Sequence, residues 1–265
     1  MAPTSGTGPI GRRPLRAVVF DVDGTLVDSE RDGHRVAFNR AFEEAGLSYH
    51  WDVATYGELL RTTGGQRRLE AFLLDRGHDG DEAGDLALKL HEIKTAVFRD
   101  MVEAGLVPLR PGVARLVADL RGEGVQVLVA TTGSRAWVEP LLDRHFPADT
   151  FALTVTGTEV TALKPDPAAY VEVVREAGLA LSEVVAVEDS GNGLLAAKAA
   201  GLTCLVVTND YTSAQDFTGA DLVVDGFGPG ADRVAGAADV PLPGGSVTVE
   251  TLRALRAAGP AGSAG

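Results

Sequence analysis

Four acidic residues form two close pairs, Asp21 with Asp23 and Glu188 with Asp189, and each pair directly follows a run of apolar residues. Carboxylates held together repel one another and raise each other's pKa values unless a cation lies among them. A hard divalent cation with oxygen ligands removes that repulsion, and Mg2+ in proteins commonly pairs with phosphate groups. The two pairs therefore predict a Mg2+ site that acts on a phosphorylated compound.

One aspartate beside such a cation can attack phosphorus as a nucleophile and form an acyl phosphate. A second carboxyl group, held protonated, can donate a proton to the leaving oxygen and later accept one from water. A lysine and a hydroxyl group would stabilise charge on the phosphoryl oxygens, and the candidates are Lys164, Thr131 and Thr132. Either threonine can supply the hydroxyl. Considered alone, Glu188 and Asp189 could instead cap a following helix, and Lys164 could be an exposed turn residue.

These side chains need a scaffold that brings them together, and the surrounding sequence indicates a parallel sheet. Short apolar runs with little alternation, typical of strands covered on both faces, occur at residues 17–20, 125–130, 153–155, 184–187, 204–207 and 222–224. Helical patterns lie between them, at residues 113–121, 168–177 and 194–200. The alternation predicts a doubly wound, Rossmann-like α/β fold, in which ligands bind beyond the carboxyl ends of the strands.

Prolines mark two of the expected helix starts. The helix at residues 168–177 should have Asp166 as its N-cap and Pro167 as its first residue. Pro140 lies where a helix starting at Ser134 would need an amide, so we expect that helix to begin or kink at Pro140.

The stretch between the first strand and the helix at residue 113 has helical periodicity and no convincing strand. It includes a long amphipathic pattern at residues 86–102. We therefore expect an inserted small α-helical cap domain at residues 32–105, placed over the carboxyl end of the first strand. The remaining chain divides into a flexible lead-in, the two parts of the α/β core, and a C-terminal helix with a flexible tail, at residues 1–13, 14–31, 106–240 and 241–265.

The composition argues against several classes of protein. The 265 residues carry a formal net charge of −13, which opposes binding to nucleic acid or to an anionic membrane. No apolar stretch approaches the roughly 20 residues of a membrane span. The single cysteine, Cys204, cannot form an internal disulfide. We expect a cytoplasmic monomer whose partner is a small phosphorylated molecule.

Several motifs together resemble those of the haloacid dehalogenase-like hydrolase superfamily, in the same order along the chain: DVDGT, a threonine after the second strand, Lys-Pro, and VEDSGNG. The resemblance implies a nucleophile, a general acid/base, a phosphate-binding hydroxyl and a charge-neutralising lysine, in the order Asp21, Asp23, Thr131 and Lys164. It also implies that Mg2+ is held by the four acids Asp21, Asp23, Glu188 and Asp189. An aspartate at position 23 favours phosphoryl transfer over dehalogenation, because the dehalogenases of this superfamily need no acid there.

A narrower resemblance covers the expected cap, where SERDGHRVAFNRAFEEAGL, WDVATYGELL and TTGGQRR are similar to the CbbY-type branch, the xylulose-1,5-bisphosphate phosphatases. It implies that five cap residues contact the sugar and its distal phosphate: His34, Arg35, Tyr56, Gly65 and Arg68. Tyr56 could instead be a packing residue of the cap. From the core, we expect Thr132 to bind substrate as well. The chain departs from that branch at Gln66, where a lysine is frequent, and at Leu163, where a second basic residue is common. Both departures bear on recognition of a second phosphate.

Two other functions remain open on this sequence. A β-phosphoglucomutase-like phosphomutase shares every core motif but returns the phosphoryl group to a sugar hydroxyl. A phospho-ligand-binding or regulatory protein without turnover belongs to a different class, and the intact pair Asp21 and Asp23 argues against it.

Overall fold

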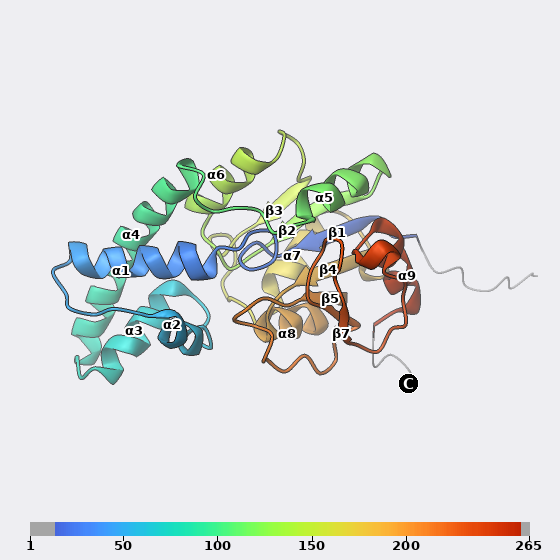
Figure 1. Cartoon of the computed structure of the whole chain (residues 1–265). Helices are drawn as coiled ribbons and strands as arrows, with labels where there is room; N and C mark the ends of the chain where they lie inside the picture. Colours follow the sequence, from blue (N-terminus) through green and yellow to red (C-terminus); the bar gives the residue numbers. More distant parts are fainter. Residues whose placement is uncertain (1–13, 261–265) are drawn as a thin grey trace, which may run out of the picture.

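The computed structural model describes residues 14–260, which fold around one central sheet (Figure 1). The described strands are β1 (Ala17–Phe20), β2 (Gln126–Ala130), β3 (Leu153–Val155), β4 (Val184–Glu188), β5 (Thr203–Val207), β6 (Leu222–Val224) and β7 (Arg233–Ala235). Their spatial order is β3-β2-β1-β4-β5-β6-β7, and all neighbours are parallel except β6 and β7. The predicted parallel sheet is confirmed. The antiparallel edge strand β7 was not expected, because its three residues are all exposed and carry no apolar pattern.

Helices cover both faces of the sheet. One face packs against α5 (Val113–Gly122), α6 (Arg135–His145) and α9 (Val249–Ala258), and the other against α7 (Ala168–Glu176) and α8 (Gly191–Ala199). Side chains alternate between the faces along a strand, so Phe20 of β1 enters the first layer and Val19 the second. Both are fully buried, which is why the strands show no polar alternation. Short 3-10 helices precede β4 and α9, at Leu181–Glu183 and Pro243–Gly245.

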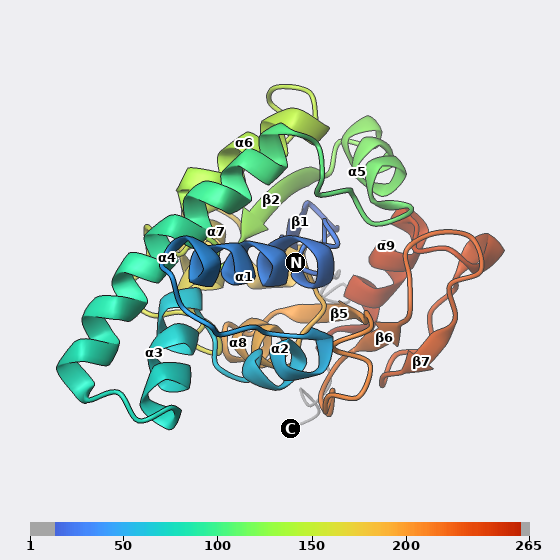
Figure 2. The same cartoon turned by 60° about the vertical axis from the view of Figure 1, so that its left-hand side comes forward.

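Between β1 and α5 the chain forms the inserted helical cap. It comprises a π-helical turn (Glu30–His34) and the helices α1 (Arg35–Glu44), α2 (Val53–Leu59), α3 (Gly65–Asp75) and α4 (Gly80–Glu103). These helices lie together to one side of the sheet, as two views agree (Figures 1 and 2). They enclose an apolar core of their own, whose largest buried side chains include Phe38, Phe42, Trp51 and Tyr56.

Helix α4 connects the cap with the sheet layer. Its Leu90 packs in the apolar core of the cap, whereas Val97, Phe98 and Met101, two to three turns further along, pack in the core of the sheet. The N-terminus of α4 is capped by Asp79, whose carboxylate accepts a hydrogen bond from the amide of Glu82. One continuous helix therefore joins both cores.

The expectation that a helix starts at Pro140 is wrong, and the N-cap expected for the next helix is shifted by one residue. Helix α6 begins at Arg135 and continues through Pro140. Its apolar face, with Trp137 and Leu141, is buried in the apolar cluster that also contains Phe98 of α4, and this burial outweighs the roughly 3 kcal/mol that an interior proline costs. Helix α7 begins at Ala168, as the expected range does, but its N-cap is Pro167 and not Asp166; the carboxylate of Asp166 still accepts a hydrogen bond from the Ala168 amide at 2.9 Å.

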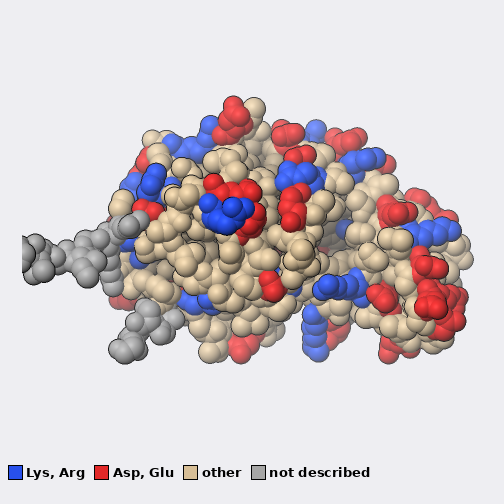
Figure 3. Space-filling view, turned by 180° about the vertical axis from the view of Figure 1, so that it is seen from behind, with Lys and Arg blue, Asp and Glu red and all other residues tan. Residues whose placement is uncertain are grey.

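The C-terminal helix expected after residue 240 is α9, and it belongs to the packed core, because Leu252 and Leu255 lie fully buried in the cluster that also contains α5. The lead-in expected at residues 1–13 and the last five residues of the expected tail lie outside the described residues. Among residues 14–260, no helix combines the length and apolarity needed to cross a membrane. On the face shown in Figure 3, acidic and basic side chains of the described residues are interspersed.

Candidate active site

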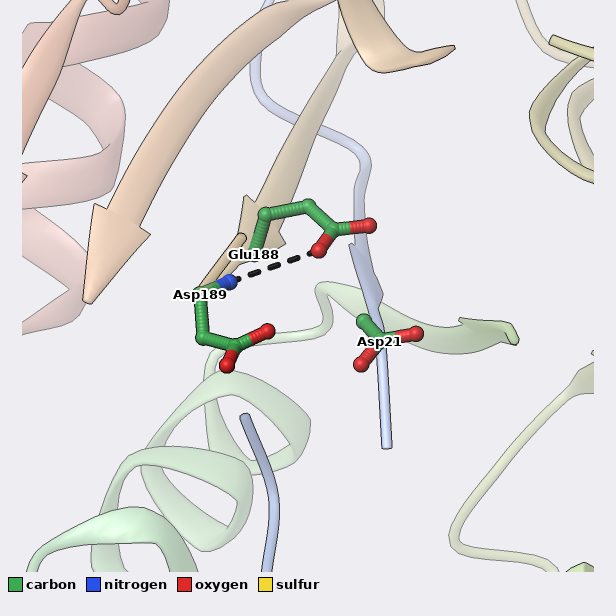
Figure 4. Close-up of side chains that lie close together, drawn as sticks. All are labelled: Asp21, Glu188 and Asp189. Carbon is green, nitrogen blue, oxygen red and sulfur yellow. Dashed lines mark hydrogen bonds between the residues drawn. The ribbon is translucent and has the colours of Figure 1, made fainter. Parts of the chain in front are cut away.

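Three carboxylates meet at the carboxyl ends of β1 and β4. Figure 4 shows Asp21, directly after β1, facing Asp189, directly after β4, with Glu188 beside them. One carboxylate oxygen from each of the three lies within 4.8 Å of the other two, and all three side chains are buried. The expected fourth acid, Asp23, lies outside this group because its carboxylate contacts the cap instead.

Lys164 lies between two of these acids. Its Nζ donates hydrogen bonds to Asp21 Oδ1 at 2.7 Å, to Glu188 Oε1 at 2.5 Å and to the carbonyl oxygen of Ala130 at 2.9 Å. The hydroxyl of Tyr170 also donates to Glu188 Oε1. Burial favours the neutral amine, but Asp21 and Glu188 outweigh it and raise the pKa of Lys164 above its usual value. The lysine is therefore a buried cation, and the interpretation of Lys164 as an exposed turn residue does not hold.

The three acids Asp21, Glu188 and Asp189 carry more negative charge than Lys164 alone can neutralise. Burial raises the pKa of Asp21 to about 7; Lys164 opposes that rise, while Glu188 and Asp23 add to it. Burial and the neighbouring Asp21 and Glu188 raise the pKa of Asp189 well above its usual value. The carboxylates repel one another and offer only oxygen ligands, and both properties fit a hard divalent cation.

Two glycines, which have no side chain, provide the space that two of these carboxylates occupy. Gly24 has φ +77°, and a Cβ there would overlap the carboxylate of Asp189. A Cβ on Gly193, in the first turn of α8, would overlap the carboxylate of Glu188. Ser190 is the N-cap of α8 and accepts a hydrogen bond from the Gly193 amide at 3.1 Å. Because Ser190 caps the helix, the interpretation of Glu188 and Asp189 as capping residues is not supported.

Asp23 belongs to a second polar network that reaches into the cap. Its Oδ1 lies 2.6 Å from His34 Nε2 and accepts a hydrogen bond from Ser29 Oγ at 2.5 Å. Lys94, from α4, lies 2.9 Å from the other ring nitrogen, His34 Nδ1, and both side chains are buried. Because the Lys94 ammonium has donors only, it donates to His34 Nδ1, and the ring proton on Nε2 faces Asp23.

The charge state of Asp23 differs from the protonated form expected from the sequence. Burial alone would raise the pKa of Asp23, but His34 and the hydrogen bonds from His34 and Ser29 outweigh it, and the pKa is lowered. Burial lowers the pKa of Lys94 to about 8, with Asp23 and Glu30 opposing that change. In this state Asp23 is ionised, which is the form of a general base, and a proton source lies two hydrogen bonds away.

A cavity of about 1380 Å³ opens over the acids, between cap and core. Among the candidate residues, those that line it are Asp21, Asp23, His34, Gly65, Arg68, Thr132, Lys164 and Asp189. Thr131, Arg35, Tyr56 and Glu188 do not. Thr131 is 1% exposed, and its hydroxyl accepts a hydrogen bond from the Gly133 amide at 3.1 Å, whereas the neighbouring Thr132 faces the cavity.

The cap candidates outside the cavity wall support the cap itself. Arg35 donates to the carbonyl oxygens of Arg31 and Trp51, at 3.0 and 3.2 Å. Tyr56 is fully buried and receives a hydrogen bond at 3.2 Å from Arg68, which does line the cavity. Tyr56 therefore supports Arg68 from the side away from the cavity.

Sequence reasoning missed three polar residues next to the acids: Lys94, Ser29 and Asn209. Lys94 stands four residues after Leu90 and three before Val97, on the buried stripe of α4, and a lysine on an apolar stripe is a readable signal. Asn209 follows the end of β5, and its Nδ2 donates to Asp189 Oδ2 at 2.7 Å. The rule that function follows strand ends would have included Asn209.

Comparisons with known proteins agree with this geometry. The family model described as "haloacid dehalogenase-like hydrolase" matches residues 15–201. The plasmid-encoded protein CbbY of Cupriavidus necator is 39% identical over 92% of this chain and 96% of its own length. The crystal structure of CbbY from Rhodobacter sphaeroides in complex with phosphate is similar with a TM-score of 0.73 and 41% identity, over 80% of this chain and 94% of that one.

A mutant of the same Rhodobacter sphaeroides protein, in complex with xylulose-(1,5)bisphosphate, matches equally well, with a TM-score of 0.73, 41% identity and the same coverage of 80% and 94%. The resemblance in the core motifs and in the cap is thereby confirmed over most of the chain. The protein belongs to the haloacid dehalogenase-like hydrolase family and, within it, to the CbbY-type branch of phosphatases.

Proposed function

We propose that the protein is a Mg2+-dependent sugar phosphatase that hydrolyses xylulose 1,5-bisphosphate, or a closely related sugar bisphosphate, through an aspartyl phosphate on Asp21. The observation that carries the proposal is the meeting of Asp21, Asp189 and Lys164 on the wall of one cavity. The substrate follows from likeness, since the CbbY protein solved with xylulose-(1,5)bisphosphate is 41% identical to this chain.

Asp21 and Asp189 would hold the cation, with Glu188 behind them, because Glu188 is 1% exposed and its Oε1 is bonded to Lys164 and Tyr170. The bound cation would supply positive charge that offsets the phosphate and lowers the repulsion between the acids. Lys164 would stabilise the phosphoryl oxygens, and Thr132, which faces the cavity, would bind one of them.

In the first half-reaction, an oxygen of Asp21 forms a bond to phosphorus while the ester bond between phosphorus and the sugar oxygen breaks. The sugar oxygen takes a proton from Asp23. That proton reaches Asp23 from His34 Nε2 as Lys94 delivers one to Nδ1, along the contacts of 2.6 and 2.9 Å. In the second half-reaction, water attacks phosphorus, the bond to Asp21 breaks, and Asp23 accepts a proton from the water. That proton returns through His34 to Lys94, which restores the starting protonation state.

A phosphate-release screen over sugar monophosphates and bisphosphates, ranked by kcat/KM, tests the proposal. We expect xylulose 1,5-bisphosphate near the top, and release that stops with EDTA, returns with Mg2+ and is absent in Asp21→Asn. A low rank for xylulose 1,5-bisphosphate would overturn the substrate assignment alone. Ligand binding without release, in the presence of Mg2+, would overturn the enzymatic assignment. Isomerisation of a hexose phosphate without release would instead identify a phosphomutase.

A further inference from the structure

The turn after β5 holds one of the cavity acids. Asn209 Nδ2 donates a hydrogen bond to Asp189 Oδ2 at 2.7 Å and lies 3.5 Å from the carbonyl oxygen of Gly24. Asn209 thus bonds one of the two carboxylate oxygens of Asp189. The other, Oδ1, accepts no hydrogen bond from the described residues. The amide of Asn209 therefore fixes which oxygen of Asp189 stays free.

The same turn is closed by its own side chains. Asn209 Oδ1 accepts hydrogen bonds from the amides of Tyr211 and Thr212, at 3.0 and 3.2 Å. Thr212 Oγ1 accepts one from the amide of Asn209 at 3.0 Å. These bonds close residues 209–212 into one hydrogen-bonded turn that contains both Asn209 and Tyr211.

Tyr211 places this unit against the cap. Its ring meets the ring of Tyr56, in α2, edge-on with centroids 6.0 Å apart. A Cβ built on Gly57, also in α2, would lie 3.1 Å from Tyr211 Cδ1, so the glycine permits the close approach of helix and ring. The Tyr211 hydroxyl oxygen is buried without a hydrogen-bond partner among the described residues, so the contact is made by the ring. The nearby pair of Asp210 and Arg31 is exposed, with 3.5 Å between its charged atoms, and contributes little.

We infer that residues 209–212 are a positioning element: Asn209 orients Asp189 for a divalent cation, and Tyr211 makes that orientation depend on the seating of cap helix α2. The inference rests on the proposed cation-dependent function. Partners that hold a metal-binding side chain commonly change metal affinity when they are removed, although they never touch the metal. A turn that merely closes the chain would affect stability and leave cation affinity unchanged.

The test measures Mg2+ affinity of the full chain without substrate, by titration calorimetry with MgCl2 and by the shift of the thermal unfolding midpoint. In Asn209→Ala we expect Mg2+ affinity to fall by about tenfold. In Tyr211→Ala it should fall several-fold, and in the matched control Tyr211→Phe, which keeps the ring, it should not change. In the double variant Asn209→Ala/Tyr211→Ala, affinity should be no lower than in Asn209→Ala, because both changes break one unit.

Unchanged Mg2+ affinity in a folded Asn209→Ala would overturn the positioning role, and so would an equal loss in Tyr211→Phe and Tyr211→Ala. Additive losses in the double variant would overturn the link to the cap. Should Asn209→Ala not fold, the two Tyr211 variants decide the question. Failure of the wild-type protein to bind Mg2+ is a separate result, and it would overturn the proposed function itself.

Discussion

A single residue separates Asp21 from Asp23 in the sequence, yet their surroundings shift their pKa values in opposite directions. Burial raises the pKa of Asp21 to about 7, and the other core acids add to that rise. His34 and Ser29 overcome burial at Asp23 and lower its pKa. Two carboxyl groups with separated pKa values can serve as nucleophile and as acid/base, so the cap residue His34 contributes to the division of roles.

Lys94 is the residue whose replacement tests the proton source. Lys94→Met should lower kcat by about a hundredfold, the lower end of what general acid catalysis contributes. In the wild-type protein kcat should fall as pH rises through about 8, where Lys94 loses its proton in the presence of Asp23, Glu30 and Arg68, and the variant should lack this limb. The pH dependence of phosphate release measures both effects.

Lys89→Met is the matched control for Lys94→Met, because Lys89 lies on the exposed side of the same helix. Its kcat and pH profile should equal those of the wild-type protein. A Lys94→Met protein that retains the wild-type fall in kcat near pH 8 would contradict the assigned proton source.

The site is determined by three parts of the fold: the ends of β1 and β4 and the start of α8. Gly193 lies in the first turn of α8, and a Cβ there would overlap the carboxylate of Glu188. Gly193→Ala should push Glu188 away from Lys164 and reduce phosphate release by about 10- to 100-fold, as for other partners of metal-binding residues. Measured kcat and Mg2+ affinity check this.

Gly122→Ala is a suitable control for Gly193→Ala. Gly122 closes α5, and a Cβ there would meet nothing within 4 Å. Full activity is expected, with unchanged or slightly higher stability. Equal activity in the two alanine variants would show that the close approach of α8 to Glu188 has no functional role.

The sequence predicted these elements well where a strand is buried on both faces. Apolar runs located β1 and β4, and the polar residues directly after them reach the same rim because parallel strands end there. It could not place Lys94 or Asn209, whose partners lie 60 and 20 residues away in the chain. Those contacts depend on how α4 and the turn after β5 pack, which local patterns do not encode. The continuation of α6 through Pro140 was missed for the same reason.

Helix α4 couples cap and core by contributing side chains to both apolar clusters. The chain has two tryptophans, and they lie in different clusters: Trp51 is buried in the cap core, and Trp137 in the sheet-layer cluster, where its ring packs edge-on against Phe98 of α4. We expect both to follow one unfolding transition. Fluorescence of Trp51→Phe and Trp137→Phe, each with one remaining tryptophan, should reach its midpoint together with that variant's own loss of helical circular dichroism.

Within either single-tryptophan variant, a fluorescence midpoint at a clearly lower denaturant concentration than the circular dichroism midpoint would show that cap and core unfold independently. A shared transition would mean that changes in the cap alter the stability of the catalytic layer as well.

Chemical trapping can establish whether Asp21 accepts the phosphoryl group. The enzyme is mixed with a phosphorylated sugar and Mg2+, quenched in acid during turnover and reduced with borohydride, which converts an acyl phosphate to an alcohol. Mass spectrometry should find homoserine in place of Asp21 and unmodified aspartate at Asp23 and Asp189. An unmodified Asp21 together with phosphate or reduction at another residue, under conditions in which phosphate is released, would show that Asp21 is not the nucleophile.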